Sequence, residues 1–145
     1  MLKIICLGKL KESYLTELVT DYTKRISKYH KIEIIELKDE ESLEREEKSI
    51  LKHIGEKDYV ITLEIEGYSL DSIEFANRLD STFIKTSCIT FVIGSSLGLS
   101  AKIKERSDFS LTFSKMTFPH GLFRGVLLEQ IYRAFKINNH ENYHK

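Results

Sequence analysis

Two short loops hold the residues whose types and spacing point to ligand binding. The first, the glycine loop, is Gly94-Ser95-Ser96-Leu97-Gly98, in which two glycines allow a sharp turn and a close approach to a ligand. The second, the proline loop, is residues 114–120, Ser-Lys-Met-Thr-Phe-Pro-His, with the only proline of the chain. Backbone groups of such loops can pair with the edge of a base while apolar side chains cover its face: Leu63, Ile93, Met116 and Phe118. The pattern favours an adenosine-containing ligand.

Several other chemistries do not fit the spacing. The glycine loop lacks both the G-x-G-x-x-G pattern of dinucleotide sites and the Lys-Ser/Thr ending of a P-loop. Ser95 and Ser96 have no evident base partner, which argues against a serine nucleophile. No group of His, Cys, Asp and Glu has metal-ligand spacing, so no metal is expected. Cys6 and Cys88 fall in expected strands and should be buried free thiols.

The elements that must position these loops alternate between strand and helix. Short β-branched and apolar runs predict strands over residues 2–7, 32–37, 59–65, 88–93 and 109–113. Helical spacing predicts helices over residues 13–29, 39–54, about 71–83, 101–106 and 120–137. This alternation predicts an α/β fold with a mostly parallel sheet and helices on both faces. Both loops then follow strand ends, where ligands bind in such sheets.

The helices also carry expected faces. The first two apolar stripes are Tyr14, Leu18, Tyr22, Ile26 and Tyr29, and then Leu43, Ile50, Leu51 and Ile54. The third is Ile73, Ala76, Leu79 and Phe83. The many glutamates of residues 39–54 are expected to face solvent, which makes this segment the least promising place for a site. Leu63 and Glu64 lie near a strand's carboxyl end, beside the expected ligand crevice.

Length and composition indicate one globular domain over residues 1–145. Hydrophobic residues make up 41% and charged residues 30%, as in ordinary globular proteins, and no apolar run could span a bilayer. Residues 1–7 fit a strand rather than a signal peptide, so the cytoplasm is expected. The net charge is zero, but basic residues predominate before residue 32 and after residue 99. A polyanionic partner is therefore allowed, and Lys9 and Lys11 are either RNA contacts or ordinary surface.

Several motifs occur together in one order along the whole chain. They are Leu7–Lys11, Val60–Gly67, Phe91–Gly94, Leu97–Leu99, Phe113–His120, Arg124, Glu129–Gln130, Tyr132–Phe135 and Tyr143–Lys145. In these motifs the chain resembles the ribosomal large-subunit pseudouridine N-methyltransferases of the knotted SPOUT superfamily. It departs from them at Ser95, where the family usually has a second glycine. It departs again at Gly125, where the family has a branched apolar residue and glycine costs a helix up to about 1 kcal/mol.

The resemblance implies a bent S-adenosylmethionine molecule bound within a C-terminal trefoil knot. It also implies a homodimer, in which a partner subunit helps to complete the active site, acting on a pseudouridine in a stem-loop of the assembled ribosome. Neither a membrane nor a metal is implied. The cofactor contacts carry over to residues of both loops and one strand end: Leu63, Gly94, Phe113, Ser114, Lys115, Met116, Thr117 and Phe118.

The same resemblance suggests catalytic residues. His144 is the candidate proton acceptor, since an imidazole can take a proton near neutral pH. Tyr143 could stack on or hydrogen-bond the target base, and Arg124 and Arg133 could bind RNA phosphate or stabilise developing negative charge. Lys145 could hold a phosphate. Two further substrate contacts are expected at Lys9 and His120.

Structural alternatives remain open for these residues. The C-terminal segment could be frayed, His120 could simply begin a helix, and Arg133 could pair with Glu129 one turn away. Met116 and Phe118 could fill the core. Three other functions also remain open: methylation of another RNA position such as a ribose hydroxyl, ribosome binding with an adenosine ligand but no chemistry, and a flavodoxin-like binding domain.

Overall fold

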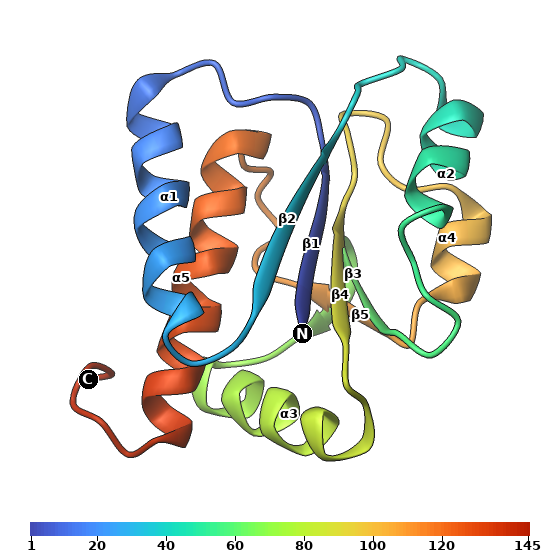
Figure 1. Cartoon of the computed structure of the whole chain (residues 1–145). Helices are drawn as coiled ribbons and strands as arrows, with labels where there is room; N and C mark the ends of the chain where they lie inside the picture. Colours follow the sequence, from blue (N-terminus) through green and yellow to red (C-terminus); the bar gives the residue numbers. More distant parts are fainter.

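A five-stranded sheet forms the centre of the folded molecule, with helices on both of its faces (Figure 1). The computed structural model describes residues 1–145. The strands are β1 (Leu2–Leu7), β2 (Ile32–Leu37), β3 (Tyr59–Ser69), β4 (Ile89–Ile93) and β5 (Phe109–Thr112). The helices are α1 (Ser13–Ser27), α2 (Leu43–Leu51), α3 (Ser72–Lys85), α4 (Ala101–Arg106) and α5 (His120–Asn138). None of these helices combines the length and the apolar character that crossing a bilayer requires.

The strand order is β2-β1-β4-β3-β5, and every pairing between neighbours is parallel. The predicted α/β class with a mostly parallel sheet is therefore confirmed. Because parallel strands all point the same way, their carboxyl ends lie along one edge of the sheet. The glycine loop follows β4 and the proline loop follows β5, so the sheet delivers both loops to that edge.

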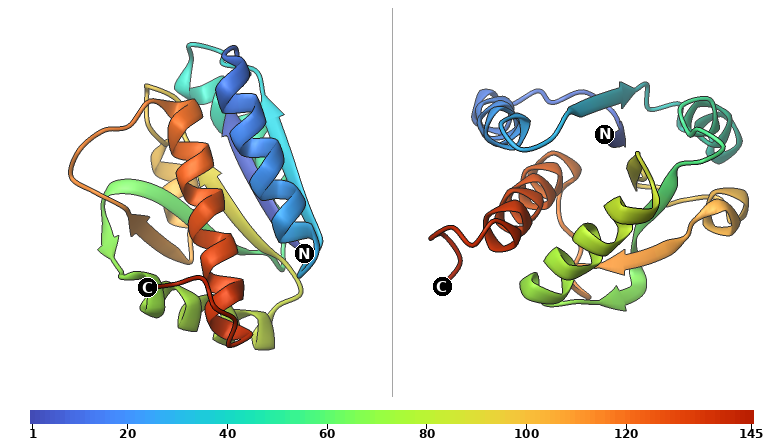
Figure 2. Two further views of the ribbon diagram at one scale, coloured as in Figure 1. Left: turned by 90° about the vertical axis from the view of Figure 1, so that its left-hand side faces the viewer. Right: turned by 60° about the horizontal axis from the view of Figure 1, so that its bottom comes forward.

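Alternating side chains of the strands form a core on each face of the sheet. Leu2, Ile4 and Cys6 of β1 point to the face covered by α1, α3 and α5. Ile5 and Leu7 point to the face covered by α2 and α4 (Figures 1 and 2). This is the two-residue period of a strand that is buried on both sides.

The two cysteines are free, as predicted. Cys6 is buried and Cys88 is half-buried. Burial raises the pKa of the Cys6 thiol to about 11, which keeps it protonated and unreactive at neutral pH.

Some predicted helix faces and boundaries are wrong. Tyr14 is 66% exposed and Ile73 is 51% exposed, whereas nearby apolar residues of the same helices, such as Leu15 and Phe75, are buried. Apolar residues stand close together in both helices, so packing against α5 and the sheet selects which of them face inward. The second helix begins only at Leu43, because the Ser42 side chain accepts a hydrogen bond from the backbone N–H of Arg45 and caps it there.

Gly125 has a packing reason. It lies in α5 against α1, and a Cβ at this position would stand 2.3 Å from Cδ2 of Leu18. The glycine thus allows the two helices to approach closely, which offsets the helix propensity that it lacks.

Asp58 joins the amino ends of three strands. Its Oδ2 accepts hydrogen bonds from Lys3 Nζ at 2.6 Å, from the Gly55 backbone N–H at 2.8 Å and from Thr90 Oγ1 at 2.9 Å. Burial by itself raises the pKa of Asp58, but the three donors together lower the pKa below its ordinary value. The carboxylate is therefore more stable in the folded chain than in the unfolded one.

This lowered pKa predicts a pH dependence of stability. The contribution of Asp58 is present above the carboxyl's unfolded pKa of about 4 and is lost as the pH falls through the lower folded pKa. Asp58→Asn should lower the free energy of unfolding at pH 7 by about 2 kcal/mol and weaken its decline below about pH 4. Urea unfolding between pH 7 and pH 2 measures both. Asp21→Asn, which breaks the exposed pair with Arg25, is the control and should change neither. If the free energy of unfolding of Asp58→Asn falls at acidic pH as steeply as that of the unsubstituted chain, the prediction is contradicted.

Candidate functional site

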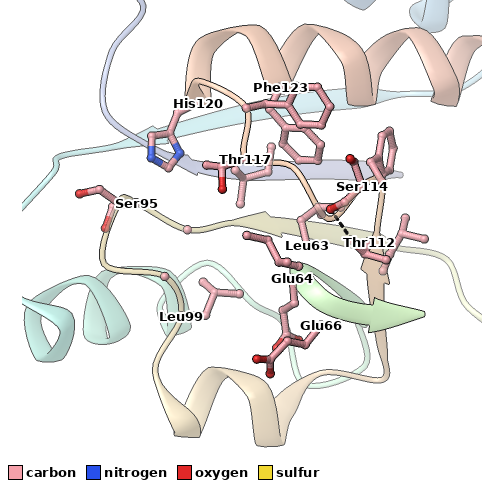
Figure 3. A pocket seen from close by; sticks show the side chains of 18 of the residues that line it. Leu63, Glu64, Glu66, Ser95, Leu99, Thr112, Ser114, Thr117, His120 and Phe123 are labelled. Carbon is pink, nitrogen blue, oxygen red and sulfur yellow. Dashed lines mark hydrogen bonds between the residues drawn. The ribbon is translucent and has the colours of Figure 1, made fainter. Parts of the chain in front are cut away.

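A cavity of about 590 Å³ opens at the carboxyl ends of β3, β4 and β5 (Figure 3). This volume lies within the roughly 300–1,000 Å³ typical of small-molecule sites. Both the glycine loop and the proline loop line it, so the structure brings together the two segments that the sequence singled out. In Figure 3, Thr117 and His120 stand on one side of the cavity, and Leu99 and Glu66 on the other.

A bulge in β3 supplies the acidic side of the cavity. Leu63 and Tyr68 both pair with Leu111 of β5, so the residues between them leave the ladder. Glu64 and Glu66 of this bulge line the cavity. The predicted strand ended at residue 65, before Gly67, whereas β3 continues to Ser69, and Glu66 was not predicted as a site residue.

Glu64 is held in place within that bulge. Its Oε2 accepts a hydrogen bond from Thr62 Oγ1 at 2.6 Å, and its Oε1 lies 3.7 Å from Lys104 Nζ. One carboxylate face is therefore neutralised by a neighbouring cation. Glu66 has no such partner and leaves this wall acidic.

The glycine loop folds tightly on itself. A Cβ on Gly94 would stand 2.6 Å from the carbonyl oxygen of Gly98, and the Gly98 N–H donates to the carbonyl of Ser95 at 2.9 Å. Behind the loop, Ser95 Oγ donates to Oε1 of Glu46 in α2 at 2.6 Å. Glu46 is only 2% exposed. The prediction that the glutamates of this segment face solvent is therefore wrong for Glu46, because this side chain packs under the loop.

Aromatic contacts hold the proline loop. Phe123, in the first turn of α5, stacks on Phe118 with ring centroids 5.8 Å apart and meets Phe113 edge-on at 5.1 Å. Ser114 Oγ accepts from the Met116 N–H at 2.9 Å, which closes a turn. Met116 is 77% exposed and lines the cavity, so it does not fill the core.

Most of the predicted cofactor-contacting residues line the cavity. They are Leu63, Gly94, Phe113, Ser114, Met116, Thr117 and Phe118, and Lys115 is the exception. Of the predicted substrate contacts, His120 also lines it, whereas Lys9, Arg133 and Lys145 do not. Leu99 and Phe123 were missed, although Phe123 could be found from its position one turn after Pro119. No group of three or more His, Cys, Asp or Glu side chains is placed to hold a metal ion.

Arg124 lies outside the cavity lining. It is 2% exposed, and its NH1 stands 2.6 Å from Glu36 Oε2 while NH2 donates to the carbonyl of Gly8 at 3.1 Å. Its Nε has no hydrogen-bond partner. The side chain therefore ties α5 to β2 and to the basic turn that carries Lys9.

This ion pair predicts a stability effect. Glu36→Ala should lower the free energy of unfolding by about 2 kcal/mol, because the buried Arg124 guanidinium would lose its charge partner. We expect a smaller loss of stability than for a fully buried ion pair, because the Glu36 side chain is 38% exposed to solvent. Urea unfolding measures it. Glu33→Ala, at an exposed position of the same strand, is the control, and equal unfolding midpoints for the two variants would contradict the prediction.

The tail (residues 139–145) folds back onto α5. Tyr143 Oη donates to Glu129 Oε2 at 2.7 Å, and Arg133 pairs with the same carboxylate at 2.9 Å. The Arg133 guanidinium lies 4.8 Å from the centroid of the Tyr143 ring, and its NH1 is 3.1 Å from His144 Nδ1. Burial, followed by the hydrogen bond to Glu129, raises the pKa of Tyr143, so its phenol stays protonated. The tail is thus docked rather than frayed, and Arg133 does pair with Glu129.

This cluster packs on the middle and the C-terminal half of α5, whereas the cavity lies at the N-terminal end of the helix. Arg133 is thirteen residues after His120, or about 20 Å along the helix axis. Figure 2 shows the tail at the end of α5 remote from the proline loop. Within one copy of the chain, Tyr143 and His144 therefore do not meet the cavity.

Known proteins resemble this chain over nearly its whole length. Residues 1–144 match the family described as "Predicted SPOUT methyltransferase". The "Ribosomal RNA large subunit methyltransferase H" of Clostridium tetani is 51% identical, over 98% of each chain. The protein of the same name from Streptococcus agalactiae is 50% identical, over 99% of each.

A solved structure shares the fold. It is that of "a probable methylase family protein from Haemophilus influenzae Rd KW20", with a TM-score of 0.58 at 12% identity. The match covers 99% of this chain and 70% of that one. The family match over nearly the whole length, with relatives about 50% identical, leads to one assignment: the chain belongs to the SPOUT methyltransferase family.

Proposed function

We propose that this chain transfers a methyl group from S-adenosylmethionine to large-subunit ribosomal RNA. The observation that carries the proposal is the cavity between the glycine and proline loops, in a chain of the SPOUT methyltransferase family. Relatives about 50% identical over the whole chain are named as ribosomal RNA large subunit methyltransferases. The flavodoxin-like alternative is set aside because the family is a different one.

The lining residues fit S-adenosylmethionine. Apolar side chains such as Leu63 and Phe118 can cover an adenine face, and the missing side chain at Gly94 leaves backbone accessible. Glu66 offers a negative charge to a ligand that carries a sulfonium and an ammonium group. When bound, S-adenosylmethionine supplies an electrophilic methyl group. The contribution of the protein is then mainly to hold the two reactants in line.

The finer proposal is that the acceptor is N3 of a pseudouridine in the assembled ribosome, and that the enzyme is a homodimer. The ring nitrogen carries a proton that must leave, for which His144 is the proposed acceptor. Arg133, beside His144, can bind RNA phosphate or stabilise negative charge on the base. Since these side chains do not line the cavity of their own copy, and Arg133 lies about 15 Å along α5 from the lining residue Phe123, a second copy is proposed to supply them. We also propose that this chain has the C-terminal trefoil knot of the family.

Mass mapping of rRNA tests this function. Ribosomes lacking the methyl group are incubated with the protein and S-adenosylmethionine. One ribosome preparation has the target pseudouridine, and the other has a uridine at that position. The expected result is one added methyl group on the pseudouridine base, and none when a uridine stands there. A methyl on a ribose hydroxyl would favour the alternative acceptor. Binding of ribosomes and cofactor without any methylation would favour the non-catalytic module.

A further inference from the structure

Glu46 is a buried carboxylate that the proposed mechanism does not use. It lies in α2, outside the cavity lining, and is 2% exposed. Its Oε1 accepts from Ser95 Oγ at 2.6 Å, and its Oε2 accepts from the backbone N–H of Glu40 at 3.2 Å. An acidic side chain is rarely buried without strong partners, because losing water is costly. The partners of Glu46 link the segment before α2 to the glycine loop.

Ser95 is the point at which this link meets the cavity. It lines the cavity and is 6% exposed. While its hydroxyl donates to Glu46, the same oxygen accepts from the backbone N–H of Leu97 at 3.2 Å. The direction of the hydroxyl is therefore set, and with it the turn between Ser95 and Gly98. The hydrogen bond to Glu46 is charge-assisted, and such bonds are stronger than neutral ones.

We propose that Glu46 is a positioning residue for the glycine loop. Acting through Ser95, it holds residues 94–98 in the conformation that receives S-adenosylmethionine. A loop with two glycines has much conformational freedom to lose, so an anchor that orders it before binding strengthens affinity. This inference rests on the proposed function and assigns a role in it to a helix that does not touch the ligand site.

The adjacent residue offers a matched control. Oε1 of Glu47 accepts from Ser100 Oγ, also at 2.6 Å. Ser100 caps α4 and does not line the cavity. Glu46 and Glu47 thus make hydrogen bonds of the same kind from the same helix, and only the first of them reaches the cavity.

The test measures the dissociation constant of S-adenosylmethionine by calorimetry, together with the thermal unfolding midpoint of each variant. Ser95→Ala and Glu46→Met should each raise the dissociation constant about tenfold. The double variant should also raise the dissociation constant by about tenfold only, because the two substitutions remove the same hydrogen bond. Glu46→Gln keeps an acceptor for Ser95 and should stay within about threefold. Glu47→Met should change the dissociation constant by less than about twofold. It should lower the unfolding midpoint about as much as Glu46→Met does.

Two results would overturn the inference. One is an unchanged dissociation constant in both Ser95→Ala and Glu46→Met, which would leave the pair with a purely structural role. The other is an equal loss of affinity in Glu47→Met. If Glu46→Met does not fold, Ser95→Ala decides alone, since it removes a single hydroxyl. If the unsubstituted chain does not bind S-adenosylmethionine, both the proposed function and this inference are overturned. If it binds and only the variants behave differently from expectation, the inference alone is overturned.

Discussion

Gly94→Ala is expected to weaken S-adenosylmethionine binding at least about a hundredfold. The added Cβ would stand 2.6 Å from the carbonyl oxygen and 2.9 Å from the carbonyl carbon of Gly98, both of them backbone atoms. Neither atom can rotate away, so the glycine loop itself must shift. Because the loop forms one wall of the cavity, a shift there changes the shape of the site directly. Calorimetric titration with S-adenosylmethionine measures the effect.

Leu97→Ala is the matched control for this variant. Leu97 belongs to the same loop, is 49% exposed and does not line the cavity. Its dissociation constant should stay within about twofold of that of the unsubstituted chain. Tight binding by Gly94→Ala, in a chain with a normal unfolding transition, would mean that the cofactor binds elsewhere.

The two loops that line the cavity were predictable because they depend on local and topological rules. Glycines after a buried strand and a proline before a helix mark loops at strand ends, and a parallel sheet gathers those ends. For this reason Leu63, Gly94 and Phe118 were indicated by the sequence and line one cavity. The resemblance to the family named the same positions by an independent route.

Features that depend on tertiary contacts were harder to predict. Glu46 precedes the buried Ile50 by four residues, so it lies on the inner stripe of α2, whereas Leu43, also predicted there, is 38% exposed. A glutamate interrupting such a stripe is a signal, but only the fold reveals that Ser95 is its partner. Gly67 illustrates a second ambiguity, because a glycine in a strand can either end it or mark a bulge. Here it marks a bulge, and Glu64 and Glu66 face the cavity as a result.

His144→Ala is expected to lower the methylation rate by about a hundredfold to ten-thousandfold while leaving S-adenosylmethionine affinity unchanged. The imidazole contacts Arg133 and is remote from the cavity of its own copy, so cofactor binding should not depend on it. Single-turnover methylation of ribosomes and calorimetric titration separate the two quantities. His140→Ala, at an exposed position of the same segment, is the control. An undiminished rate in His144→Ala would remove this residue from the mechanism.

The same variant shows whether the tail acts within its own copy or in a partner. Gly94→Ala has an impaired cavity and an intact tail, and His144→Ala has the reverse. If each cavity uses the tail of the other copy, a dimer containing one subunit of each kind has one intact site out of two. Its activity should then be about half that of the unsubstituted dimer, although both parent homodimers are nearly inactive.

The mixed dimer can be isolated by co-expressing the two variants with different affinity tags and purifying on both. If the tail instead swings back to its own cavity, both sites of the mixed dimer are defective and it stays inactive. The cluster of Glu129, Arg133 and Tyr143 favours the first outcome, because it holds the tail on α5 and outside the cavity lining. If the two tags do not co-purify, the proposed homodimer is wrong. In that case a single copy must bring His144 to its own cavity, which requires release of the tail from Glu129.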